Sequence, residues 1–155
     1  MLCNSCFCVF FFFVLMDLFS QKKNVLGNLS TQLEYFMINN NLIFGEIPSA
    51  IGNFISMISL WMDGNKFIGT IPSDIGNLQK LPWLLLSYNK LSGRLPITLG
   101  NLSSVSDMPF ENNRLQGTIP SSIGKCKNLN LLNLSQNNLS GPIPKQLFED
   151  RKSVV

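Results

Sequence analysis

Histidine is absent from the 155 residues of this chain, and charged side chains are scarce. Charged residues make up 14% of the sequence, and 12 Lys and Arg against 9 Asp and Glu give a net charge of +3. Without histidine, the commonest general base and the commonest metal ligand are both missing. A positive charge this small and this dispersed argues against nucleic-acid binding. We therefore expect a non-enzymatic protein with no metal, no cofactor and no nucleic-acid partner.

Cysteine is also rare and forms no disulfide framework. Cys3, Cys6 and Cys8 crowd the N-terminus beside an apolar run, and Cys126 stands alone. Nothing downstream of the first three has the ligand spacing of a zinc site. Cys126 replaces a leucine of the repeat described below, so we expect a buried core residue rather than a reactive thiol.

A run of ten apolar residues, from Phe7 to Met16, dominates residues 1–23. A spanning helix needs about 20 apolar residues, so this run is too short to predict a membrane span. Its length fits the apolar part of a secretory signal peptide, but no Lys or Arg precedes it and no small-residue cleavage site follows it. Residues 1–23 are therefore an apolar leader that is either a signal peptide or a non-native segment without a targeting role.

The most informative feature is an internal repeat with a constant period of 24 residues, which is the step from Asn41 to Asn65. Three residue types keep this step over five cycles, which chance does not produce. They are the prolines of an Ile/Leu-Pro pair (Pro48, Pro72, Pro96, Pro120, Pro144), a glycine (Gly45, Gly69, Gly93, Gly117, Gly141) and an asparagine (Asn41, Asn65, Asn89, Asn113, Asn137). Three apolar residues precede each asparagine at spacings of three and two, beginning with Leu33, Phe36 and Ile38. Five coils of the form LxxLxLxxNxLxGxIPxxLGxLxx therefore tile residues 33–152.

The repeat has a direct structural interpretation. The LxL step has a period of two, which predicts a short strand whose apolar side chains point into the coil. Stacked coils would align these strands in a parallel sheet. The asparagine amide both donates and accepts, so we expect it to satisfy backbone groups of its own coil and of the next coil. Glycine permits a positive φ at the following bend, and proline suits an irregular or 3₁₀ return.

Two prolines interrupt this regularity. Pro82 lies beside the strand expected within residues 81–87, and Pro109 lies inside the strand expected within residues 107–111. Because proline cannot donate to a ladder, we expect both strands to be distorted and the fourth coil to be the weakest.

The segments GNLSTQLEYF, NKLSGRLPITLGNLSS and LNLSQNNLSGPIPKQL resemble the plant-type leucine-rich repeat. The similarity is closest to ectodomains of leucine-rich-repeat receptor-like kinases, in the subfamily that senses microbial elicitors. It covers residues 24–152 and leaves residues 153–155 as a tail. The resemblance implies an α/β solenoid, right-handed, with about five coils and a parallel sheet on the concave face. It also implies a plasma-membrane or extracellular location and a peptide or co-receptor ectodomain as partner.

Other functions remain open at this point. The signatures of the family's kinase domain, a Gly-rich phosphate loop and the VAIK, HRD and DFG motifs, do not occur. The array also looks cut at both ends, so a truncated gene product without independent function is one alternative. A secreted inhibitor of a cell-wall-degrading enzyme is another, although the paired-cysteine caps of such inhibitors are missing here.

In repeats of this type, the variable strand positions six, four, two and one residues before each asparagine face the concave side. Both tryptophans and both tyrosines of the chain occupy such positions, together with three acidic residues. Exposed aromatic side chains are typical binding anchors, and the acidic residues favour a basic or aromatic peptide. The candidate ligand-binding residues are Tyr35, Trp61, Asp63, Trp83, Tyr88, Asp107, Glu111 and Asn133. Alternatively, these residues fill exposed strand positions through β-propensity alone, without a ligand.

Four Asn-x-Ser sequons are candidate N-glycosylation sites, at Asn28, Asn101, Asn133 and Asn138. Secreted members of the family are glycosylated, which makes these sites plausible. Asn133 is also expected on the concave face, where a glycan would obstruct a ligand.

Overall fold

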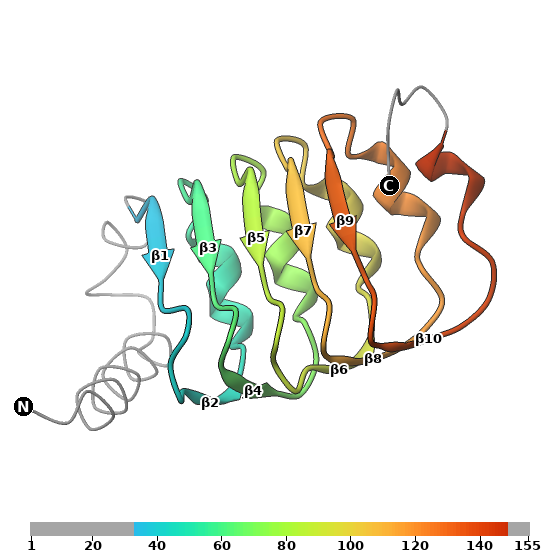
Figure 1. The fold of residues 1–155 in the computed structure, drawn as a ribbon. Helices are drawn as coiled ribbons and strands as arrows, with labels where there is room; N and C mark the ends of the chain where they lie inside the picture. Colours follow the sequence, from blue (N-terminus) through green and yellow to red (C-terminus); the bar gives the residue numbers. More distant parts are fainter. Residues whose placement is uncertain (1–32, 149–155) are drawn as a thin grey trace, which may run out of the picture.

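The computed structural model describes residues 33–148, and the apolar leader and the C-terminal tail lie outside this range. Figure 1 shows stacked coils with one row of strands side by side. The row is a five-stranded parallel sheet of β1 (Tyr35–Met37), β3 (Ser59–Trp61), β5 (Trp83–Leu85), β7 (Asp107–Pro109) and β9 (Leu131–Asn133). Tyr35 lies opposite Ser59, and Ser59 lies opposite Trp83, so the register of the sheet steps by one full repeat. The predicted solenoid with a parallel sheet is confirmed.

Short 3₁₀ helices form the side of each coil opposite the sheet (Figure 1). They are η1 (Ser49–Asn53), η2 (Ser73–Asn77), η3 (Ile97–Asn101), η4 (Ser121–Lys125) and η5 (Lys145–Leu147). A proline of the repeat precedes each helix, as Pro72 does with φ −67° before η2. The Pro72 C=O accepts the Ile75 N–H at 3.2 Å. The missing Pro72 N–H costs the helix nothing, because an N–H at the start of a helix has no acceptor within it.

The prediction of an irregular or 3₁₀ return was incomplete, because each coil contains a second strand. These strands are β2 (Phe44–Glu46), β4 (Lys66–Ile68), β6 (Ser92–Arg94), β8 (Arg114–Gly117) and β10 (Asn138–Leu139). They pair in parallel as β2–β4 and as β6–β8–β10. Phe44 pairs with Lys66 and Ser92 with Arg114, so the register here is shorter than the full repeat of the sheet. Such short strands form only because the neighbouring coil supplies the ladder.

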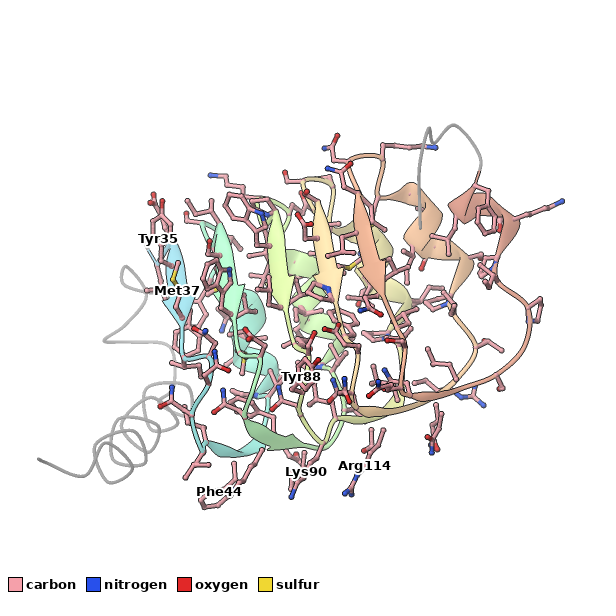
Figure 2. The ribbon with its side chains drawn as sticks, in the orientation of Figure 1. Tyr35, Met37, Phe44, Tyr88, Lys90 and Arg114 are labelled. Atoms are coloured by element: carbon pink, nitrogen blue, oxygen red, sulfur yellow. The ribbon has the colours of Figure 1, made fainter. Side chains whose placement is uncertain are left out.

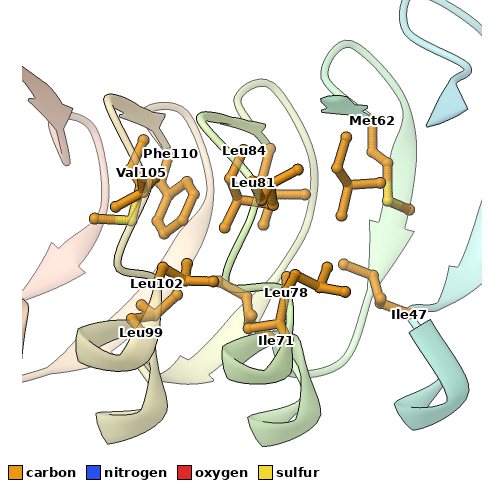
Figure 3. Packing of buried hydrophobic residues seen from close by; sticks show 14 of the residues in the cluster. Ile47, Met62, Ile71, Leu78, Leu81, Leu84, Leu99, Leu102, Val105 and Phe110 are labelled. Atoms are coloured by element: carbon orange, nitrogen blue, oxygen red, sulfur yellow. The ribbon is translucent and has the colours of Figure 1, made fainter. Parts of the chain in front are cut away.

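The core runs continuously along the inside of the coils (Figure 3). Leu60, Leu84 and Met108 in the middle of the sheet strands are fully buried, which confirms the inward direction of the LxL step. Cys126 is also fully buried, as its replacement of a leucine predicted, and its Sγ lies 3.3 Å from the Leu99 C=O.

The expected distortion is seen at Pro109 but not at Pro82, since β5 pairs with β3 at all three of its positions. β5 and β7 pair only between Trp83 and Asp107, whereas β3 and β5 pair at three positions. Pro109 has no N–H to donate to β5, which shortens this one pairing. Pro82 precedes β5, and its C=O accepts the Asp107 N–H at 3.0 Å. The lower stability of the fourth coil stays a prediction.

Candidate ligand-binding face

The asparagine side chains form hydrogen bonds with the backbone next to the sheet strands. The Ile43 N–H donates to Asn65 Oδ1 at 3.1 Å, and Asn65 Nδ2 donates to the C=O of Ile38 at 2.9 Å and of Met62 at 3.2 Å. Asn89, Asn113 and Asn137 repeat this pattern. Each asparagine therefore bonds to its own coil and to the preceding coil.

The expectation of bonds to the next coil was wrong in direction. Ile43 and Asn65 are separated by 22 residues, which is the register of the second strands and not that of the sheet. Each asparagine side chain therefore reaches the coil before it, at the register of the second strands. The sequence repeat carries no information on this direction, because it is set by how the coils stack.

The residue before each asparagine has a left-handed backbone. Asn40, Tyr88, Asn112 and Gln136 have φ of 54–55°, and Gly64 has φ of 65°. This conformation was not predicted, although asparagine and glycine at three of the five positions were a signal for it. The chain turns out of the sheet at this point, so Tyr88 lies at a corner of the coil and is 59% exposed.

The remaining variable positions form three parallel rows along the sheet, which we call the sheet face; Tyr35 and Met37 at its N-terminal end are labelled in Figure 2. The rows are Tyr35, Ser59, Trp83, Asp107 and Leu131; Met37, Trp61, Leu85, Pro109 and Asn133; and Asn39, Asp63, Ser87, Glu111 and Ser135. Seven of the eight predicted site residues lie on this face, and Tyr88 lies at its corner. None of the fifteen residues is Lys or Arg, although the chain carries a net positive charge.

The exposed apolar side chains of the sheet face are spread along its length. Tyr35, Met37, Trp83 and Leu131 are exposed, with Trp83 at 43%. Trp61 lies between Met37 and Leu85 in its row and is half-buried. Its indole Nε1–H is buried without a hydrogen-bond partner among the described residues.

The acidic side chains of the sheet face differ in their environments. Ser87 Oγ donates to Glu111 Oε2 at 2.7 Å, and Ser106 Oγ donates to Asp107 Oδ2 at 2.5 Å. Asp63 Oδ1 is buried and accepts no hydrogen bond from the described residues. Desolvation by burial raises the pKa of Asp63 above its ordinary value of 3.8, a hydrogen bond from its own backbone lowers it, and the Glu111 carboxylate raises it further.

We expect Asp63→Asn to raise the melting temperature at pH 7 and to have little effect near pH 3. Because the folded-state pKa is raised, the folded chain binds more protons than the unfolded chain between the two pKa values. Stability is therefore lost as the pH rises through this window, and asparagine removes that loss. Thermal unfolding followed by circular dichroism from pH 3 to pH 7 measures the effect. Equal gains in melting temperature at pH 3 and pH 7 would contradict this origin.

The sequons lie in different settings. Asn101 and Asn138 are exposed, whereas Asn133 is half-buried on the sheet face, where its Oδ1 accepts the Ser135 N–H at 3.1 Å. Asn28 lies outside the described residues. Glycosylation of all four stays a prediction, and a glycan on Asn133 would have to displace this hydrogen bond.

Residues 33–148 contain neither a candidate metal site nor a candidate membrane-spanning helix. No three His, Cys, Asp or Glu side chains in this range are grouped so that they could hold a metal ion. Within the same range, every helix is too short or too polar to cross a lipid bilayer.

Comparison with known proteins supports the fold. The leucine-rich repeat family model matches residues 32–54, 56–78, 80–102 and 128–149. No curated protein is significantly similar to the chain.

Several solved plant receptor structures are similar to this chain. The plant peptide hormone receptor RGFR1, in complex with RGF2, is 42% identical with a TM-score of 0.75, over 79% of this chain and 19% of that chain. The ectodomain of the membrane receptor kinase GASSHO1/SCHENGEN3 from Arabidopsis thaliana, in complex with CASPARIAN STRIP INTEGRITY FACTOR 2, is 38% identical with a TM-score of 0.75. This match covers 79% of this chain and 15% of that chain. The Arabidopsis receptor kinase HAESA, in complex with the peptide hormone IDA and the co-receptor SERK1, is 32% identical with a TM-score of 0.71. This match covers 76% of this chain and 20% of that chain. The present chain thus spans less than a quarter of each of these structures.

Proposed function

Because this chain belongs to the leucine-rich repeat family, with a fold like that of plant receptor-kinase ectodomains, we propose that it is a recognition module whose sheet face binds a peptide. The observation that carries the proposal is the composition of that face. It displays aromatic and aliphatic side chains and three carboxylates, without a cation among its fifteen residues.

The chemistry of the sheet face favours an extended, basic or aromatic peptide. Trp83 and Tyr35 offer apolar area at low entropic cost, as binding anchors do. Asp63 and Glu111 lie in one row and can attract Lys or Arg side chains, because charge complementarity guides association. Five strands at a spacing of about 4.8 Å span roughly 19 Å, which accommodates about six extended residues. So short a contact predicts weak binding by this segment alone.

The family resemblance adds finer expectations to this proposal. We expect the repeat pattern to cover residues 24–152 and the parent protein to be a receptor-like kinase of the elicitor-sensing subfamily. Its location is the plasma membrane or the extracellular space, and its role lies in signalling or defence. The structures of RGFR1 with RGF2 and of HAESA with IDA and SERK1 support a peptide, or a co-receptor ectodomain, as the kind of partner.

We expect Trp83→Ala to weaken peptide binding by about tenfold or more, because truncation of a central aromatic anchor costs about 2 kcal/mol. Peptides selected on the full chain from a library of randomised linear peptides serve as ligands. Their affinities for the wild-type chain and the variant are measured by biolayer interferometry. The selected peptides should be enriched in Lys, Arg and aromatic residues.

Ile97→Ala is the matched control for this experiment. Ile97 is 71% exposed on η3, on the opposite side of the coils, so its truncation should leave the affinity unchanged. Equal affinities of the wild-type chain and the Trp83→Ala variant would rule out the sheet face. A library that yields no binder would also count against the proposal.

A further inference from the structure

A second surface of the molecule is strongly basic. It is formed by the strands that follow each asparagine, at the lower edge of the coils in Figure 2, where Phe44, Lys90 and Arg114 are labelled. We call the exposed cations Lys66, Lys90, Arg94 and Arg114 the basic edge. This surface is separate from the sheet face and plays no part in the function proposed above.

The direction of these side chains follows from the strand period. In β4 and β8 the burial alternates, so that Lys66 and Arg114 are exposed while Phe67 and Leu115 are buried. Arg94 is exposed at the end of β6. Its aliphatic stem lies over Gly117 of the next coil, where a Cβ would lie 3.1 Å from Arg94 Cγ. Glycine at this position therefore leaves room for the arginine to lie along the edge.

The cations of the basic edge have no acidic partner. No ion pair involves them among the described residues, and Glu46 is the one carboxylate of the described second strands. Glu46 pairs with Ile68 of β4, the strand that carries Lys66, and lies outside the sheet that contains Arg94 and Arg114. The edge thus carries four cations against one carboxylate, whereas the sheet face carries three carboxylates and no cation. Four unpaired cations on one surface favour an anionic partner.

The spacing of the cations is regular. Lys66, Lys90 and Arg114 occupy the same repeat position, directly after the asparagine, in three successive coils. With strands about 4.8 Å apart and a register offset of two residues, the backbone positions of neighbouring cations lie about 8 Å apart. A row of equally spaced cations suits a linear polymer with equally spaced anions better than it suits an irregular protein surface.

Two exposed aromatic residues are backbone neighbours of this row. Phe44 is 56% exposed and pairs directly with Lys66 across β2 and β4. Tyr88 is 59% exposed at the corner, and its C=O accepts the Asn65 N–H at 3.2 Å, beside the start of β4. Flat aromatic rings next to cations are suited to sugars that carry carboxylates. The aromatic ring stacks on the face of the sugar ring, while the neighbouring Lys or Arg pairs with the sugar's carboxylate.

We propose that the basic edge binds a linear acidic polysaccharide of the polyuronate class, with carboxylates paired to Lys66, Lys90, Arg94 and Arg114 and with sugar rings against Phe44 and Tyr88. Arginine contributes bidentate bonds to a carboxylate, and lysine contributes a mobile point charge. The cations are solvent-exposed, so the attraction should fall steeply as the salt concentration rises.

Oligogalacturonate is the probe, and its binding to the full chain is measured by isothermal titration calorimetry at low salt. The triple variant Lys90→Ser, Arg94→Ser and Arg114→Ser should lose about tenfold or more in affinity, because it removes three exposed charge pairs with the polymer. The control is Lys80→Ser, Lys125→Ser and Lys145→Ser, which removes the same charge from exposed positions elsewhere. Equal losses in the two variants, or no binding by the wild-type chain, would overturn the proposal.

Two further arms identify the chemistry of the partner. Methyl-esterified oligogalacturonate keeps the sugar rings but lacks the charges, so it should not bind. Tyr88→Asn removes one ring and keeps a residue suited to the left-handed backbone, as Asn40 and Asn112 show at the equivalent positions. It should weaken binding of oligogalacturonate but not of poly-glutamate. Poly-glutamate that binds the edge as tightly as oligogalacturonate would instead identify an acidic polypeptide as the partner.

Discussion

Replacement of Asn89 by alanine is expected to lower the free energy of unfolding by about 3 kcal/mol. The Phe67 N–H donates to Asn89 Oδ1 at 3.0 Å, and the substitution leaves this fully buried donor without its acceptor. Asn89 Nδ2 also donates to the C=O of Met62, Leu86 and Ser87, and these three bonds are lost. An orphaned buried donor alone costs about 1–3 kcal/mol.

Urea unfolding of the full chain, followed by circular dichroism, measures this change. Asn77→Ala is the matched control, because Asn77 is exposed at the end of η2 and its side chain makes no hydrogen bond with the described residues. Its effect should stay within about 0.5 kcal/mol. Asn89→Asp keeps an acceptor for Phe67 but turns a carboxylate toward three carbonyl oxygens, so it should also be destabilising at pH 7. Wild-type stability of Asn89→Asp would show that the donated bonds contribute nothing.

Gly76→Ala should destabilise the chain by a similar amount, about 3 kcal/mol, for a different reason. A Cβ on Gly76 would lie 2.5 Å from the Thr98 C=O oxygen and 2.6 Å from Thr98 Cβ. Thr98 belongs to η3 and is itself held by the bond from its Oγ1 to the Ser73 C=O at 2.6 Å. The 3₁₀ helices would have to separate, and such overpacking costs about 1–3 kcal/mol or more.

Ser121→Ala is the control that tests whether the loss of stability comes from the close approach of Gly76 to Thr98 and not from any alanine substitution in a 3₁₀ helix. Ser121 begins η4, is exposed and makes no side-chain hydrogen bond with the described residues, so its replacement should be nearly neutral. Both variants are compared by urea unfolding. A Gly76→Ala chain as stable as the wild type would mean that the helices can shift without cost.

The two charged surfaces lead to different expectations for salt. Peptide binding on the sheet face relies partly on Trp83 and Tyr35, whose apolar contacts are not screened by ions. Polysaccharide binding on the basic edge relies mainly on exposed cations, which are screened. Binding measured at low and at high salt should therefore separate the two sites in the wild-type chain.

The sequence by itself determined the coil. The recurrence of Asn, Gly and Pro at one constant period predicted five coils, the strand positions and the burial of Leu60, Leu84 and Cys126. These features are local to one coil, because side-chain period, backbone φ and burial depend on nearby residues. The rows of the sheet face followed from the same phase, since equivalent residues of successive coils are paired.

Only the tertiary structure decided how one coil meets the next. The sheet keeps the register of a full repeat, whereas the shorter register on the edge produced the second strands and the bonds of Asn65 to the preceding coil. The same stacking explains the close approach of Gly76 to Thr98 of the next coil. A sequence repeat gives the length of one coil but not the pairing register between neighbouring coils. That register depends on the balance of packing and hydrogen bonds across the whole stack.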